Sequence, residues 1–364
     1  MTTWVSGTRA AASAATDGAP RRGLVLGGGG MLGAAWTVGA LCAVEEATGR
    51  RPGDADVLLG TSAGAILAAL LAGGVGADQL RDHQRGLPVT VGPLAGVDFD
   101  YATAVGGALP PRPRAGIGSP GLLRDAVRHP REYPLLTMVS AMAPHGRGSL
   151  ARVGELVDGL FGGPAGGPAG SGGPVAGSAG SALRVVAVDY RSGHRVVFGD
   201  PDAPPAGVGE AVMASCAIPG WFAPVRVAGA AYVDGGCWSA TNADLLLDRG
   251  LDEVYVLAPM ALRLDPPGRS EPDQGASGTS RARRGGERPH GVLAQLVGRY
   301  RRSVTRQLLR EAGLLRAGGV RVHLLAPTPA DLAVMGANLM DPTRRGPVLE
   351  SALRSCRTAL EGVR

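Results

Sequence analysis

Two consecutive segments of this chain repeat the same order of short apolar run, glycine-rich turn and apolar helical stretch. The first covers residues 24–46 around the glycines of 27–33, and the second covers 57–72 around a turn at 60–64. Strand, turn and helix in succession indicate parallel strands joined by helical crossovers. The sequence therefore predicts an α/β fold with a mainly parallel sheet, and it predicts that both glycine turns lie at one edge of that sheet.

Later apolar runs predict the rest of a central sheet covered by helices. Residues 88–145 break this pattern with prolines and scattered apolar clusters, which is typical of an insertion or lid. Further strands are predicted at 183–188, 195–198, 232–233, 254–257 and 320–325, and further helices at 210–214, 292–315 and 348–360.

The 59 glycines and 28 prolines among 364 residues predict long irregular segments within a single domain. Residues 1–21 are predicted as a disordered N-terminal tail, 162–181 as a flexible Gly/Pro/Ala/Ser insert and 266–290 as a disordered arginine-rich linker. The folded core is predicted over 22–260, with helical and strand elements of 291–364 packing on it.

Charge and cysteine content narrow the partners and the compartment. All 37 basic residues are arginine and the net charge is +6, which favours solubility first and an anionic surface second; no nucleic-acid partner is predicted. Four scattered cysteines without C-x-x-C spacing argue against a zinc site or disulfide framework. With no signal peptide and no membrane-spanning run, we expect a cytoplasmic protein, with peripheral contact at the inner face of the membrane as an option. The sequence does not predict the oligomeric state.

The turn at 60–64 reads Gly-Thr-Ser-Ala-Gly, a G-x-S-x-G pattern directly after an apolar strand. A serine in such a turn needs small residues on both sides, here Gly60 and Gly64, to tolerate a strained strand-to-helix bend. An alcohol is a poor nucleophile until an adjacent base removes its proton. Ser62 is therefore a candidate nucleophile that requires a base elsewhere in the chain.

Two candidates for that base are open. Asp234 ends a short predicted strand, and Gly235 and Gly236 after it fit a tight loop that turns the carboxylate inward. Partial desolvation would make this carboxylate basic enough to take the serine proton directly. His323 follows Asp234 in the Ser, Asp, His order of α/β-hydrolases and is the alternative.

The motifs occur in one order that resembles the bacterial patatin-like phospholipases over about residues 22–260. They are the glycine loop of 27–33, G-x-S-x-G at 60–64, Ala-Ser-Cys-Ala-Ile-Pro-Gly at 214–220, Tyr-Val-Asp-Gly-Gly at 232–236 and Asn-Ala-Asp at 242–244. The resemblance implies a three-layer α/β/α fold and a serine hydrolase that cleaves lipid or small acyl esters without a metal or other cofactor. It implies Ser62 as nucleophile, Asp234 as general base, and an oxyanion hole from the loop that contains Gly28, Gly29, Gly30 and Gly33.

One loop position departs from the family pattern. The family commonly has a basic residue just before the last glycine of the loop, and this chain has Leu32 there. The oxyanion site is therefore expected to lack that charge, which favours a neutral lipid or simple ester over an anionic phospholipid.

Other functions fit parts of the same pattern. The loop also reads G-x-G-x-x-G, a dinucleotide-binding fingerprint, but the next strand ends in Gly60-Thr61-Ser62 rather than in the acidic residue that would bind ribose. A non-catalytic lipid-binding protein could keep the fold. A transacylase would use the same acyl-serine intermediate.

The predicted helix of 292–315 is amphipathic. Its apolar stripe is expected to pack on the sheet, which leaves a solvated arginine face that could adsorb to anionic vesicles. The stripe contains Leu293, Leu296, Val297, Tyr300, Val304 and Leu308, and the arginine face contains Arg299, Arg302, Arg306 and Arg310.

Overall fold

The computed structural model describes residues 19–97, 99–100, 109, 111–162, 182–263 and 292–361. The tail, the insert and the linker that the sequence predicts as disordered lie outside the described residues, apart from residues 19–21 and 162.

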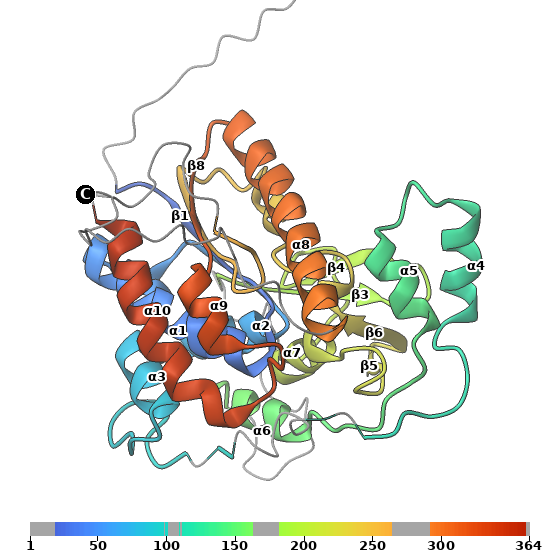
Figure 1. Ribbon diagram of the computed structural model, residues 1–364, viewed down its shortest axis with the longest axis horizontal. Helices are drawn as coiled ribbons and strands as arrows, with labels where there is room; N and C mark the ends of the chain where they lie inside the picture. Colours follow the sequence, from blue (N-terminus) through green and yellow to red (C-terminus); the bar gives the residue numbers. More distant parts are fainter. Residues whose placement is uncertain are drawn as a thin grey trace, which may run out of the picture.

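The described residues form one eight-stranded sheet with a parallel centre and an antiparallel end (Figure 1). Its order is β5-β6-β3-β2-β1-β7-β8, and β4 pairs with β3 in addition. Neighbours from β3 to β8 run parallel, whereas β4, β5 and β6 pair antiparallel. The strands are β1 Arg22–Leu26, β2 Val57–Thr61, β3 Leu183–Asp189, β4 Arg195–Phe198, β5 Val225–Val227, β6 Ala230–Asp234, β7 Glu253–Leu257 and β8 Arg321–Leu325.

Side chains of the central strands alternate between two buried faces, as expected for a sheet covered on both sides. Leu24, Leu26 and Leu58 belong to one core cluster, and Val25 and Leu59 belong to a second. Helices supply the other half of each cluster, so the molecule has three layers. The helices are α1 Gly30–Thr48, α2 Ala63–Ala72, α3 Ala77–Gln84, α4 Pro120–Arg128, α5 Leu135–Met142, α6 Ala151–Leu160, α7 Val208–Cys216, α8 Val292–Ala317, α9 Pro329–Met335 and α10 Arg345–Leu360, with short 3-10 turns η1 Pro52–Asp54, η2 Gly235–Cys237, η3 Ala243–Leu246 and η4 Pro342–Arg344.

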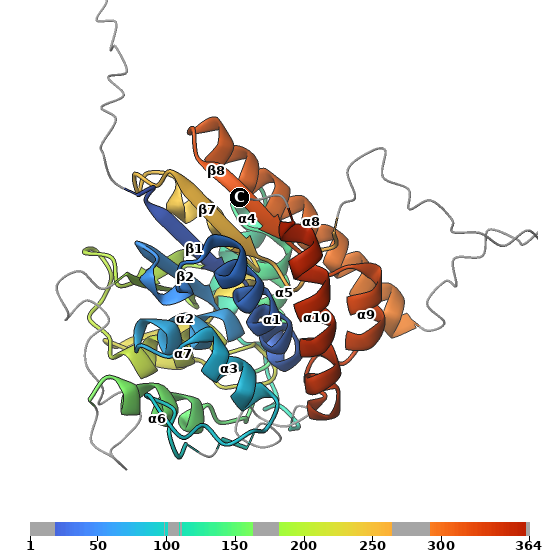
Figure 2. The same cartoon turned by 90° about the vertical axis from the view of Figure 1, so that its left-hand side faces the viewer.

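The first face is covered by α1, α2, α7 and α10, with α10 lying along α1 (Figure 2). On the second face, α8 packs Val304, Leu308 and Leu315 against the parallel strands. The described part of α8 therefore buries an apolar stripe and exposes Arg299, Arg302, Arg306 and Arg310, as the sequence predicts. Arg301 of the same helix is buried and donates to Pro259 O.

The same second face is covered at its antiparallel end by α4 and α5. Leu122 of α4 and Ala141 of α5 share a cluster with Val188 of β3 and Val233 of β6. Figure 1 shows these two helices extending from the end of the molecule away from α10. They arise from the segment that the sequence predicts only as an insertion or lid.

The predicted fold class, a three-layer α/β/α arrangement with a mainly parallel sheet, is confirmed. Helices α3 to α6 were not predicted as helices, because they are short and are separated by proline and glycine. No helix among the described residues is both long and apolar enough to cross a bilayer.

Candidate active site

Ser62 and Asp234 meet because two strands end against each other on one edge of β3. Thr61 of β2 pairs with Val186, and the next residue of β3, Ala187, pairs with Asp234 of β6. Both β3 residues also pair with β4, which must therefore occupy the opposite edge. β2 and β6 therefore pair with the same edge of β3, β2 up to Val186 and β6 from Ala187 onward. We call the place where they meet the β2–β6 junction. It brings two residues that are 172 positions apart in the sequence, Ser62 and Asp234, into contact.

Ser62 lies in the strained turn that the G-x-S-x-G pattern predicts. Its φ of 55° and ψ of −127° are a backbone conformation that non-glycine residues rarely adopt, and α2 begins at the next residue. A Cβ at Gly60 would collide with the backbone of Ala65, and one at Gly64 would collide with the carbonyl oxygen of Leu26. The two glycines are required because the turn presses its backbone against β1 and α2.

The Ser62 hydroxyl donates to Asp234 Oδ2 at 2.6 Å. The other carboxylate oxygen, Oδ1, accepts the Gly236 N–H at 2.7 Å. Ser62 is 8% exposed and Asp234 5%. Burial raises the pKa of Asp234 from 3.8 to about 6, although the hydrogen bonds from Ser62 and Gly236 oppose this rise. The carboxylate is thus mostly ionised at neutral pH, yet more basic than an exposed aspartate.

The two glycines after Asp234 have different roles. A Cβ at Gly235 would overlap the carbonyl oxygen of Val186, so only glycine lets β6 leave the sheet so close to β3. Gly236 supplies the N–H that orients the carboxylate. The Asp-Gly-Gly segment is therefore a turn that holds a charge in place.

Only half of the predicted glycine loop keeps free backbone donors. The Gly28 N–H donates to Ala240 O at 2.8 Å, and the Gly33 N–H donates to Gly29 O at 3.0 Å. The N–H groups of Gly29 and Gly30 have no hydrogen-bond partner among the described residues, and both glycines line the same cavity as Ser62. The expectation that Gly28 and Gly33 also present donors is wrong, because their N–H groups already close the loop.

Leu32, at the loop position that is usually basic, does not face the site. Its side chain is fully buried in the helix-covered core, and its N–H donates to Leu339 O at 2.9 Å. It lines neither cavity that contains Ser62. The residue consequently affects the loop through packing and makes no contact with either cavity.

Ser215 belongs to the Ala-Ser-Cys-Ala-Ile-Pro-Gly motif of residues 214–220, and the sequence alone predicts no role for it. Its hydroxyl accepts the Ser62 N–H at 2.9 Å and donates to Val186 O at 2.6 Å. The side chain is fully buried in α7. It bridges β2 and β3 at the point where their ladder of backbone bonds stops.

Asn242 is a second residue of this kind. It holds a left-handed conformation with φ 54° and donates from Nδ2 to Thr61 Oγ1 at 3.1 Å and to Ser239 O at 2.7 Å. It thereby ties the end of β2 to the loop after Asp234. Asparagine tolerates a positive φ better than most residues, so the asparagine itself, soon after Asp234, is the signal that sequence reasoning could have used.

The histidine alternative is wrong. His323 stacks on Tyr255 with ring centroids 4.5 Å apart. The residues paired with His323 across the sheet are Tyr255, Leu24 and Leu58 in turn, and Leu58 is four residues before Ser62. β8 is also three strands away from β2, about 14 Å at the usual spacing. All hydrogen bonds of the Ser62 and Asp234 side chains among the described residues are made to each other or to Gly236.

The acids near the dinucleotide-like loop are also misplaced for a ribose. Asp56 lies at the start of β2, where its carboxylate accepts the Arg22 N–H at 2.8 Å, at the opposite edge of the sheet from the glycine loop. Among the described residues, no group of three or more His, Cys, Asp or Glu could hold a metal ion.

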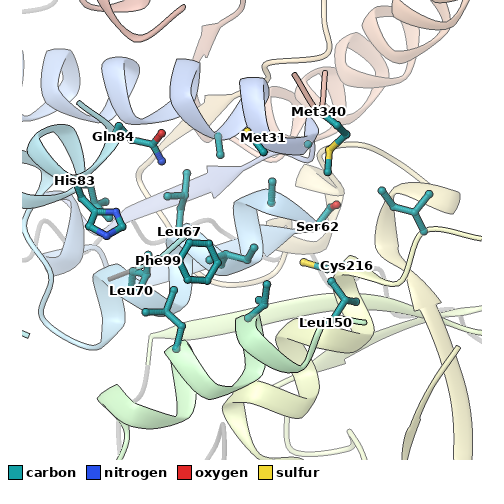
Figure 3. A pocket seen from close by; sticks show the side chains of 18 of the residues that line it. Met31, Ser62, Leu67, Leu70, His83, Gln84, Phe99, Leu150, Cys216 and Met340 are labelled. Carbon is teal, nitrogen blue, oxygen red and sulfur yellow. The ribbon is translucent and has the colours of Figure 1, made fainter. Parts of the chain in front are cut away.

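Two cavities meet at Ser62. The first is apolar and follows α2 from Ser62 past Leu67 and Leu70 to His83 (Figure 3). The second is more open and lies between α5 and the segment 338–340. Gly30, Ser62, Ile218 and Met340 line both cavities, so a molecule at Ser62 could extend into either.

The profile of the patatin-like phospholipase family matches residues 24–247. Among solved structures, VipD from Legionella pneumophila aligns at 15% identity and a TM-score of 0.43, covering 94% of this chain and 67% of that one. The type III effector protein ExoU aligns at 16% identity and a TM-score of 0.34, covering 94% of this chain and 53% of that one. This chain thus spans about half the length of the second structure. No curated protein sequence matches it.

Proposed function

The chain belongs to the patatin-like phospholipase family, and from this premise we propose that it hydrolyses lipid acyl esters through a Ser62–Asp234 dyad. The observation that carries the proposal is the 2.6 Å hydrogen bond from the Ser62 hydroxyl to a buried carboxylate that has no competing cationic partner among the described residues. A base with a pKa of about 6 stays ionised at neutral pH and still accepts a proton readily.

In the acylation step, Ser62 Oγ attacks the ester carbonyl carbon while Asp234 Oδ2 takes the hydroxyl proton. The carbonyl oxygen becomes an oxyanion, which the N–H groups of Gly29 and Gly30 stabilise. Helices α1 and α2 begin at Gly30 and Ala63 with no acidic residue in their first turns, so both positive helix ends favour the anion. The intermediate then expels the alcohol, which leaves with the proton from Asp234.

Deacylation repeats these transfers with water. Asp234 takes a proton as the water attacks the acyl-Ser62 carbonyl, and the same donors stabilise the second oxyanion. Collapse returns the proton to Ser62 Oγ and releases the fatty acid. Asp234 accepts and returns each proton in this proposed cycle, so no step calls for a metal ion. We therefore expect excess EDTA to leave the rate of ester hydrolysis unchanged.

The two cavities suggest how an ester is oriented. The apolar cavity along α2 suits an acyl chain, because its lining is almost entirely aliphatic and aromatic. The open cavity suits the alcohol part, which leaves after the first step. Cys216 and Phe222 also line the apolar cavity.

The test is labelling by a fluorophosphonate serine probe together with hydrolysis of short and long acyl esters. We expect Ser62→Ala to lose both and Asp234→Asn to lose hydrolysis by at least about a thousandfold. Ser140→Ala is the matched control, because Ser140 lines the open cavity and donates to Thr137 O but bonds to neither Ser62 nor Asp234. Undiminished labelling and hydrolysis in Ser62→Ala would refute the proposal.

A further inference from the structure

Helix α5 exposes an apolar stripe to solvent. Leu135, Val139 and Met142 are 76%, 47% and 51% exposed, and their spacing places them on one side of the helix. The opposite side, with Thr137 and Ala141, is buried against the sheet. Large apolar side chains grouped in this way on a surface commonly mark a contact site.

Helix α8 presents a basic face beside that stripe. Its exposed arginines make no ion pair among the described residues, and the one acid of α8, Glu311, is buried against Thr241 and Ala243. No acid in the described part of the chain therefore pairs with this positive charge. The exposed arginines of α8 are Arg299, Arg302, Arg306, Arg310 and Arg316.

A groove joins the two helices. Leu135 and Val139 form one wall, and Arg299, Arg306 and Arg310 lie on the other. The groove is continuous with the open cavity at Ser62, since both are lined by residues that include Leu136, Val139, Gly236, Ala240 and Tyr300. A molecule arriving at this surface is consequently next to the entrance of the proposed active site.

The segment around α5 carries the same sign of charge. Between residues 111 and 147 there are six arginines, Arg112, Arg114, Arg124, Arg128, Arg131 and Arg147, against two acids, Asp125 and Glu132. The segment that carries the apolar stripe therefore has a net positive charge, as the exposed face of α8 has. Apolar side chains among unpaired arginines are the combination that binds the interface of an anionic bilayer.

We propose that α5 and α8 form a docking surface for bilayers that contain anionic phospholipid. The stripe enters the acyl region while the arginines contact lipid phosphates, and the docked enzyme takes its ester from the bilayer through the groove. A second copy of this chain fits less well, because a two-fold contact would place arginines against arginines. This inference rests on the proposed function only for the identity of the substrate, since docking itself needs no catalysis.

The test uses full-length Ser62→Ala protein, which would leave the vesicles intact, in flotation with phosphatidylcholine vesicles with and without half phosphatidylglycerol. We expect binding that requires phosphatidylglycerol and weakens with salt. Arg299→Glu with Arg306→Glu should lower the partition coefficient on the order of thirtyfold or more. Leu135→Ser with Val139→Ser should lower it about tenfold.

The control is Arg354→Glu with Arg357→Glu, two exposed arginines of α10; the reversal changes the net charge equally and also breaks the ion pair of Arg357 with Glu46. Equal binding of the α8 and α10 variants would overturn the proposal, as would absence of binding to the anionic vesicles. So would a dimer that dissociates on Leu135→Ser with Val139→Ser while vesicle binding is unchanged.

Hydrolysis of a water-soluble butyrate ester separates this proposal from the catalytic one. The α8 variant with Ser62 intact should hydrolyse it at the wild-type rate, because Arg299 and Arg306 line the groove and not the cavity at Ser62. If the wild-type protein fails to hydrolyse it, the catalytic proposal is contradicted while the vesicle comparison still decides docking.

Discussion

The backbone N–H of Ser62 is bound by the side chain of Ser215, 2.9 Å away, rather than by the neighbouring strand. If β2 continued, this N–H would extend the ladder to β3. The Ser215 hydroxyl takes that place and passes the bond to Val186 O. It thereby supports a strained residue just where the sheet stops supporting it.

Ser215→Ala should lower kcat between about tenfold and a hundredfold while KM stays within about threefold, because Ser62 loses the contact that fixes its backbone toward Asp234. The cost in folding free energy should be about 1–3 kcal/mol, since a buried donor and a buried acceptor lose their partner. Ester kinetics and urea unfolding measure the two effects. Ser140→Ala removes a comparable hydroxyl without touching Ser62 and should keep kcat. An unchanged kcat in Ser215→Ala would contradict this role.

The pH dependence of kcat/KM should follow Asp234. Its pKa is raised to about 6 by burial, and only the ionised carboxylate can take the Ser62 proton. Activity should therefore be constant above about pH 7 and fall about tenfold per pH unit below about 6. A profile on a soluble ester from pH 4.5 to 8 tests this, and a flat profile would exclude Asp234 as the base.

Asp234→Asn should stabilise the protein at neutral and alkaline pH. The folded-state pKa of about 6 exceeds the value of 3.8, so the folded state binds more protons between these values and the free energy of unfolding falls as pH rises through them. Removing the charge should restore up to roughly 3 kcal/mol at pH 8 and less at pH 5. Urea unfolding at both pH values measures the gain, with Asp248→Asn at an exposed site as control. The same gain at both pH values would argue against a raised pKa.

A larger side chain at Leu70 should shorten the acyl chain that the apolar cavity accepts. Leu70 is eight residues along α2 from Ser62, about 12 Å. An extended chain advances about 1.2 Å per bond, so Leu70 lies at the depth of roughly the tenth bond of a chain attached to Ser62. Leu70→Trp should reduce kcat/KM for decanoyl esters at least about tenfold and leave butyryl esters unaffected. Leu314→Trp, at an exposed position of α8, should change neither.

Sequence reasoning could predict the parts of the site that depend on local chemistry. The glycines around Ser62 and after Asp234 could be recognised from the sequence, because a side chain at any of these positions would press against a neighbouring atom. The sequence could not show which N–H groups of the glycine loop are free, because the Gly28 N–H donates to the carbonyl oxygen of Ala240, more than 200 residues later. The role of Ser215 likewise depends on contacts between three distant segments.

The helical covering was harder to predict than the sheet for a related reason. The central strands can be predicted from their continuous apolar runs. Helices α4 and α5 bury only a few residues each, and they are held in place by packing against the antiparallel end of the sheet. A short helix of this kind has a weak periodic signal until its partner is known.

The β2–β6 junction has a consequence for how such an enzyme can diversify. Ser62 and Asp234 follow or belong to strands that pair with consecutive residues of β3, and Ser215 of α7 supports Ser62, so their separation does not depend on α5 or α8. The entrance formed by α5 and α8 can then be remodelled, by mutation or by design, without retuning the chemistry. In this fold, substrate range and catalytic rate can therefore change independently of each other.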